Sequence, residues 1–190
     1  RVENLARILV EHSAQVKVGD VCTIEGGSAA EPLLQAVYER VLAAGGNPIV
    51  QMAMEEQAPA FFEHASEEQL QWVSPTSEWI VENADVRIAV MASQNTRALS
   101  QVPPERQTMM QAARQHLMKR MMERSAEGSY RWALTLFPTH AYASEAGMSL
   151  SDYEAFYYGA CLATEADPVA AWKRQSEETE RLKDWIEGRS

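Results

Sequence analysis

A strand, a helix and a second strand follow one another between residues 21 and 54, and this order constrains the fold more than any other feature. Val21 to Glu25 and Ile49 to Met54 are short apolar runs, which are typical of buried strands. Residues 30–44 between them have apolar side chains at helical spacing, and the predicted buried side consists of Leu33, Leu34, Val37, Val41 and Leu42. Such a unit predicts two parallel strands joined by a right-handed crossover.

Further apolar runs extend this pattern. Val86 to Met91 is rich in β-branched residues and predicts a third strand. Trp132 to Phe137 predicts a buried fourth strand that stops at Pro138, because proline cannot donate to a sheet. Helical patterns lie between the strands and after them, and 190 residues are about enough for one domain. Residues 1–190 therefore predict a single α/β domain with a mostly parallel sheet of about four or five strands, helices on both faces and Rossmann-like or flavodoxin-like layering.

Two apolar groups in the predicted helices are open to more than one interpretation. In the long helix from about Glu105 to Ser125, Met109, Met110, Leu117, Met118 and Met121 recur at steps of three and four residues. Such a stripe can form an adaptable peptide-binding surface, but we favour core packing because the sheet needs a covering helix. For the aromatic and aliphatic group Phe61, Phe62, Trp72, Trp79 and Ile80 we expect mostly core packing, and the alternative is that one of them lines a cleft.

The charge of the chain restricts its partners. Seventeen Lys and Arg against 27 Asp and Glu give a net charge of −10, which argues against nucleic acid because its readers need cationic surfaces. No run reaches the roughly 18 apolar residues of a membrane span, and no signal peptide pattern is visible. The sequence therefore predicts a cytoplasmic protein that binds neither nucleic acid nor membrane.

Two polar segments follow predicted strands, namely residues 92–97 and 138–147. In a parallel sheet both emerge at the carboxyl edge, where open α/β sheets place ligand crevices. We therefore predict that these segments are neighbours and form a surface for substrate or for another domain. The candidate residues are Asn95, Thr96, Arg97, Thr139, His140 and Glu145.

Alternatives remain open at these positions. Asn95 and Thr96 are equally suited to bonding their own turn, whereas Arg97 is suited to a carboxylate. Residues 26–28, Gly-Gly-Ser, lie between a strand and a helix, where backbone amides bind phosphate in some proteins. They lack the lysine of the P-loop and the third glycine of the dinucleotide motif, so a tight turn is the favoured interpretation.

Catalytic residues are not evident. His12, His64, His116 and His140 form no metal-binding motif with one another. His140, Glu145 and Asp152 come nearest to a metal or acid–base group, but a third firm ligand and a nucleophile are missing. We therefore assign no catalytic, cofactor-binding or metal-binding residue within the chain.

Several motifs, in order and spacing, resemble the thermophilic metallo-aminopeptidase family of the aminopeptidase T and aminopeptidase S type. Upstream these are Asn95-Thr-Arg97, Val102-Pro-Pro-Glu-Arg106 and Arg131-Trp-Ala-Leu-Thr135. Downstream they are Pro138-Thr139, Glu145-Ala-Gly-Met-Ser-Leu150, Tyr153-Glu-Ala-Phe156 and Asp167-Pro-Val169.

The resemblance implies a two-domain enzyme that hydrolyses N-terminal residues from peptides. Such proteins have an N-terminal α/β domain and a C-terminal catalytic domain with two divalent metal ions, zinc, cobalt or similar. This chain resembles the first domain only, so we expect it to be inactive alone, to pack on its own catalytic domain and to shape the peptide entrance. The full-length protein is expected to be a homodimer. Two alternatives are a stand-alone α/β domain that binds a small molecule or nucleotide, and a non-enzymatic assembly module.

Overall fold

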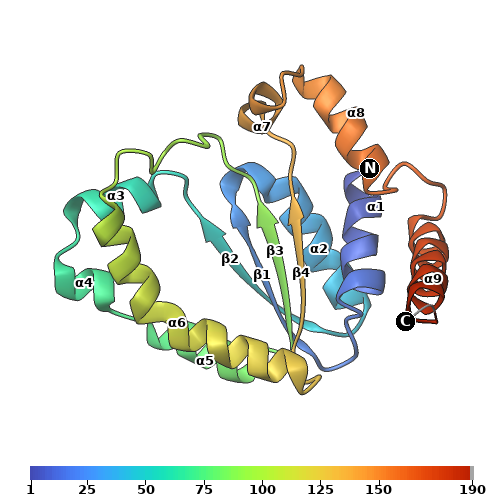
Figure 1. Cartoon of the computed structure of the whole chain (residues 1–190), viewed down its shortest axis with the longest axis horizontal. Helices are drawn as coiled ribbons and strands as arrows, with labels where there is room; N and C mark the ends of the chain where they lie inside the picture. Colours follow the sequence, from blue (N-terminus) through green and yellow to red (C-terminus); the bar gives the residue numbers. More distant parts are fainter. Residues whose placement is uncertain (189–190) are drawn as a thin grey trace.

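The computed structural model describes residues 1–188. Within these residues, four strands form one parallel sheet in the order β2-β1-β3-β4 (Figure 1). The strands are β1 (Val21–Gly27), β2 (Asn47–Ala53), β3 (Val86–Met91) and β4 (Arg131–Leu136). The predicted α/β class and the mostly parallel sheet are therefore confirmed.

Helices precede, connect and follow the strands. They are α1 (Val2–Arg7), the π-helix η1 (Ile8–Ser13), the 3₁₀ helix η2 (Ser28–Ala30), α2 (Glu31–Ala43), α3 (Gln57–His64), α4 (Glu67–Gln71), α5 (Pro75–Asn83), α6 (Pro104–Ala126), α7 (His140–Glu145), α8 (Leu150–Ala160) and α9 (Pro168–Glu187). In Figure 1, α1 and α2 lie on one side of the sheet, whereas α5 and α6 lie on the other, toward the start of the strands. None of the helices in residues 1–188 combines the length and apolar character that crossing a membrane requires.

The closed face of the sheet carries the main core. Strand side chains alternate between faces, and those of the closed face are Cys22, Ile24, Val86, Ile88, Val90 and Ala133. They pack in one cluster with Leu5, Leu9 and Val10 from α1 and η1 and with Leu33, Leu34 and Val37 from α2. This burial holds α1, η1 and α2 on the sheet.

The open face is only partly covered. It is formed by the other set of strand side chains, Glu25, Gln51, Arg87, Ala89, Met91, Trp132 and Leu134. Met91 is 52% exposed and Leu134 is 55% exposed. The prediction of a fully buried strand at 132–137 is therefore wrong for alternate residues, because β4 buries Ala133 but presents Trp132 and Leu134 to solvent.

The methionine stripe of α6 does not belong to the main core. α6 packs on α4 and α5 instead of on the sheet, so its methionines do not reach the main cluster. Its buried side chain is Arg124, whose guanidinium donates to the carbonyl oxygens of Val81, Ala84 and Ser129 at 2.7, 2.8 and 3.1 Å. The expectation that the α6 stripe packs in the core is therefore wrong for the main cluster, but Met121 packs against a second buried cluster formed by Ile80, Ala84 and Tyr130.

Other helical residues also depart from the prediction. Leu42, which was expected to be buried, is exposed, whereas Ala36 is buried. Trp72 and Trp79 are exposed, whereas Phe62 and Ile80 are buried as expected. Periodicity identified the stripes, but which member meets a neighbour depends on the packing.

Helix caps follow the local sequence. Ser149 Oγ accepts from the Asp152 N–H at the start of α8, and Asp167 Oδ1 accepts from the Ala170 N–H at the start of α9. Ser and Asp are typical residues at this position. Segment 138–147 is not a simple loop, however, because Thr139 Oγ1 accepts from the Tyr142 N–H and begins α7.

Candidate functional site

The two predicted segments meet at the carboxyl edge of the sheet. Thr139 Oγ1 donates to the Ser93 carbonyl oxygen at 2.6 Å, and the Ser93 N–H donates to the Tyr142 hydroxyl at 3.2 Å. Further out, Thr96 Oγ1 donates to Glu145 Oε1 at 2.9 Å. The expectation that residues 92–97 and 138–147 are neighbours is therefore confirmed by contacts.

Arg97 lies at the outer end of this junction. Its Nε is 3.5 Å from Glu145 Oε1, and its side chain is 80% exposed. An ion pair of this length between exposed groups contributes little to stability because water screens it. Arg97 is thus free to exchange Glu145 for another carboxylate.

Asn95 and His140 lie apart from this contact. Asn95 Oδ1 accepts from the Arg97 N–H at 3.0 Å, so its side chain caps its own turn. His140 begins α7 and lines a cavity of about 220 Å³ with Gln94, Pro138 and Leu150. No hydrogen bond or ion pair among residues 1–188 joins His140 to Glu145 or Asp152, and the Asp152 carboxylate accepts from Ser149 Oγ at 2.7 Å. The structure therefore does not assemble these three as one group.

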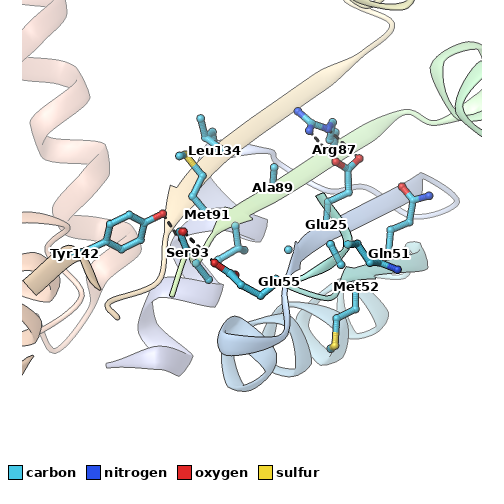
Figure 2. A pocket seen from close by; sticks show the side chains of 16 residues that line it. Glu25, Gln51, Met52, Glu55, Arg87, Ala89, Met91, Ser93, Leu134 and Tyr142 are labelled. Atoms are coloured by element: carbon cyan, nitrogen blue, oxygen red, sulfur yellow. Dashed lines mark hydrogen bonds and ion pairs between the residues drawn. The ribbon is translucent and has the colours of Figure 1, made fainter. Parts of the chain in front are cut away.

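Glu55, which the sequence analysis missed, joins the end of β2 to the segment after β3. One carboxylate oxygen, Oε1, accepts from Ser93 Oγ at 3.2 Å, from the Gln94 N–H at 2.9 Å and from the Asn95 N–H at 3.1 Å. Figure 2 shows Glu55 and Tyr142 reaching Ser93 from opposite sides. A signal was available, because Glu55 directly follows the predicted strand Ile49 to Met54, just as residues 92–97 follow theirs.

A cavity of about 620 Å³ lies beside Glu55, where the strand order changes direction between β1 and β3. Its wall includes the ion pair between Arg87 and Glu25, with two hydrogen bonds of 2.9 and 2.7 Å (Figure 2). These bonds raise the pKa of Arg87. The neighbouring loop amides already bind the Glu55 carboxylate, so a phosphate entering here meets negative charge and occupied donors.

Gly26 and Gly27 belong to β1 and not to a tight turn, so that prediction is wrong. A Cβ added at Gly26 would lie 3.0 Å from both Leu34 Cδ2 and the Val90 carbonyl oxygen. Glycine is required there by close packing between β1, β3 and α2, which accounts for the motif without a ligand.

The donor groups in residues 1–188 do not form a metal centre. No group of three or more His, Cys, Asp or Glu side chains in this part of the chain is arranged to hold a metal ion. The nearest carboxylates to the candidate junction, Glu55 and Glu145, are each engaged by hydroxyl or amide donors.

A family model described as thermophilic metalloprotease (M29) matches residues 1–190. Among solved structures, wild-type AmpT from Thermus thermophilus aligns with a TM-score of 0.78 and 22% sequence identity over 99% of this chain and 48% of AmpT. The chain thus spans about half the length of AmpT. The CurK enoyl reductase aligns over 100% of this chain and 50% of its own with 11% identity and a TM-score of only 0.31, too low to indicate a shared fold. No curated protein matches the sequence.

Proposed function

Because the chain belongs to the thermophilic metalloprotease family M29, we propose that residues 1–190 are the N-terminal domain of a two-domain aminopeptidase. The full-length enzyme hydrolyses N-terminal residues from peptides, and this domain packs on the catalytic domain and shapes the substrate entrance. The match of the family model along the whole chain is the observation that supports this proposal most. The similar fold of half of AmpT is in keeping with it.

The metal ions of such an enzyme find no matching ligand group in the part of the chain that the structure describes. A metalloprotease needs several ligands around each ion, and residues 1–188 offer no suitable group of three. We therefore assign two divalent ions, zinc, cobalt or similar, to the catalytic domain that follows residue 190. The role left to this domain is to bind and orient.

The junction between residues 92–97 and 138–147 is the proposed entrance surface. Thr139 and Tyr142 hold its inner part through part-buried hydrogen bonds, and Glu55 adds an exposed one to the Gln94 N–H, so the backbone there is well supported. Its outer part ends in the exposed Arg97 and the half-exposed Glu145. Exposed charged side chains on a well-supported backbone are suited to contact a peptide or the facing domain.

An activity assay tests the assignment of the chemistry. We expect residues 1–190 alone to show no hydrolysis of leucyl-p-nitroanilide with added cobalt or zinc, and the full-length protein to hydrolyse it. Measurable hydrolysis by residues 1–190 would place the reaction within this chain and refute the proposal that the catalytic domain carries the chemistry. An inactive, metal-loaded full-length protein would contradict the aminopeptidase assignment itself.

Arg97→Glu in the full-length enzyme tests the entrance surface. We expect KM for peptides to rise about three- to tenfold, because the new carboxylate faces Glu145 across a gap that Arg97 bridged. Arg174→Glu, which changes an exposed arginine on α9, is the matched control and should leave KM unchanged. If Arg97→Glu alters neither KM nor thermal stability, Arg97 belongs to no interface.

A small-molecule binder is the second candidate, and it is favoured by the cavity of about 620 Å³ beside Glu55. A thermal-shift screen of residues 1–190 with nucleotides tests it. We expect no shift, since Glu55 and Glu25 oppose phosphate. Cytoplasmic location and homodimer formation are further parts of the proposal, and light scattering of the full-length protein tests the latter.

A further inference from the structure

β4 is an edge strand whose outward N–H groups at Trp132 and Leu134 have no partner within residues 1–188. The N–H groups of Arg131 and Phe137 donate inward, to the Asp85 and Met91 carbonyl oxygens. Because amide directions alternate along a strand, the N–H groups of Trp132, Leu134 and Leu136 point outward. No acceptor within residues 1–188 takes those of Trp132 and Leu134.

Tyr157 fixes where this free edge ends. Its hydroxyl accepts from the Leu136 N–H at 3.0 Å and lies 2.7 Å from Thr135 Oγ1. This contact confirms the outward direction of the Leu136 amide and closes the edge at that residue. The free stretch therefore runs from Arg131 to Thr135, long enough for a partner strand of about four residues.

The free edge opens onto an apolar groove. A cavity of about 430 Å³ runs beside β4 and is lined by Leu9, Leu134, Leu136, Tyr157 and Trp172, among others. On the open face, the half-exposed side chains of Met91, Trp132 and Leu134 continue the same apolar surface. A strand placed at this edge would find both backbone partners and apolar contacts.

The two edges of the sheet differ in how they resist such pairing. β2 has Pro48 within its length, which removes one donor from its outer side. β4 has no proline and no charged side chain from Trp132 to Leu136. Natural edge strands that stay free are normally protected by charge, proline or a bulge. Between Trp132 and Leu136, β4 lacks the first two, and the guanidinium of Arg131 at its start is paired with Asp20.

We propose that an extended segment from the other half of the same polypeptide pairs with β4 at Trp132 and Leu134 and covers the adjoining open face. This inference rests on the proposed function, in which a second domain follows residue 190. All-parallel sheets almost always have both faces covered, usually by the helices of their own crossovers. The present chain leaves one face of the sheet open at β3 and β4, and it aligns with only 48% of AmpT. The second half of the proposed full-length polypeptide is therefore the segment best placed to cover this face.

Hydrogen exchange at single amides of the full-length protein tests this pairing. We expect the amides of Trp132 and Leu134 to exchange at least 100-fold more slowly than those of Val50 and Met52. The amides of Val50 and Met52 are matched controls on the other edge strand. The Asn47 N–H donates inward to the Asp20 carbonyl oxygen, and because amide directions alternate, the N–H groups of Val50 and Met52 point outward. Equal exchange at the two edges would overturn the proposal. So would protection that disappears on dilution, because the occupant would then be a second copy of the chain.

Leu134→Pro in the full-length protein tests the same contact by removing one outward donor. We expect the Trp132 amide to exchange at least tenfold faster and the Tm to fall. The matched change Val50→Pro on β2 should change neither the exchange of the Trp132 amide nor the Tm. Loss of Tm without loss of protection at Trp132 would contradict edge pairing. Peptide hydrolysis is measured separately, since an inactive protein with a protected β4 edge would refute the proposed function and leave this inference standing.

Discussion

The closed and open faces of the sheet come from the same four strands and yet have opposite surroundings. On the closed face, Ile24 and Ile88 are fully buried under α1, η1 and α2. On the open face, Met91 and Leu134 are more than half exposed, and the main polar contact is the Glu25–Arg87 ion pair. Neighbouring residues of one strand, such as the buried Ala133 and the exposed Leu134, therefore belong to different environments.

The direction of the crossovers explains this difference. The β1 to β2 and β3 to β4 connections run in opposite directions across the sheet, so right-handed crossovers place α2 and α6 on opposite faces. α2 packs on its face, but α6 packs on α4 and α5. The open face lacks close cover because of where α6 rests, and not because its strands are polar.

The largest expected effect tests this contrast directly. Ile88→Ala should lower the free energy of unfolding by about 3 kcal/mol, because it leaves a cavity in a fully buried cluster. Leu134→Ala on the neighbouring strand should cost less than about 1 kcal/mol, because half of that side chain is already in water. Urea unfolding of residues 1–190, followed by circular dichroism, measures both. Equal losses would show that the open face is covered in solution.

The sequence predicted the closed face better than the open one. Val86 to Met91 was predicted with the observed bounds, since a run of β-branched residues suits a strand whatever covers it. The methionines of α6 and the tryptophans Trp72 and Trp79 were assigned to packing, and they are not in the main core. Helical spacing shows that a stripe exists, but it does not show whether another element lies against it.

The candidate site was also predicted only in part. Strand order along the chain was enough to bring Thr96 and Arg97 next to Glu145, because parallel strands end at one edge. It did not reveal that Glu55 would bind the Gln94 and Asn95 amides, because this depends on the bend of the chain after β2. It also did not separate Asn95, which bonds its own turn, from its neighbours.

A smaller effect is expected at the polar contact of the open face. Arg87→Met keeps most of the aliphatic stem but leaves the Glu25 carboxylate unpaired in a partly buried place, so we expect a loss of about 1 to 2 kcal/mol. Glu25→Gln and the double variant complete a double-mutant cycle measured by urea unfolding. A coupling energy near zero would show that the open face gains no stability from its ion pair. The difference between the closed and open faces would then depend on their apolar side chains alone.

The smallest effect concerns Tyr157, which joins α8 to the β4 edge. Tyr157→Phe removes the acceptor of the Leu136 N–H and the partner of Thr135 Oγ1, which should cost about 1 kcal/mol at pH 7. Burial raises the pKa of Tyr157 to about 12 from its ordinary value of 10. The fold therefore favours the neutral hydroxyl, and this contribution is complete below pH 10 and is lost as the pH rises toward 12.

Unfolding of the wild type and of Tyr157→Phe across pH 8 to 12 separates the two parts of this prediction. Both proteins should lose stability above pH 10, because burial also raises the pKa of Tyr130 and Tyr158 to about 12. The loss should be less steep in the variant, which has one titrating hydroxyl fewer at the sheet. Identical slopes would mean that water reaches Tyr157, and that the β4 edge is as open at Leu136 as it is at Leu134.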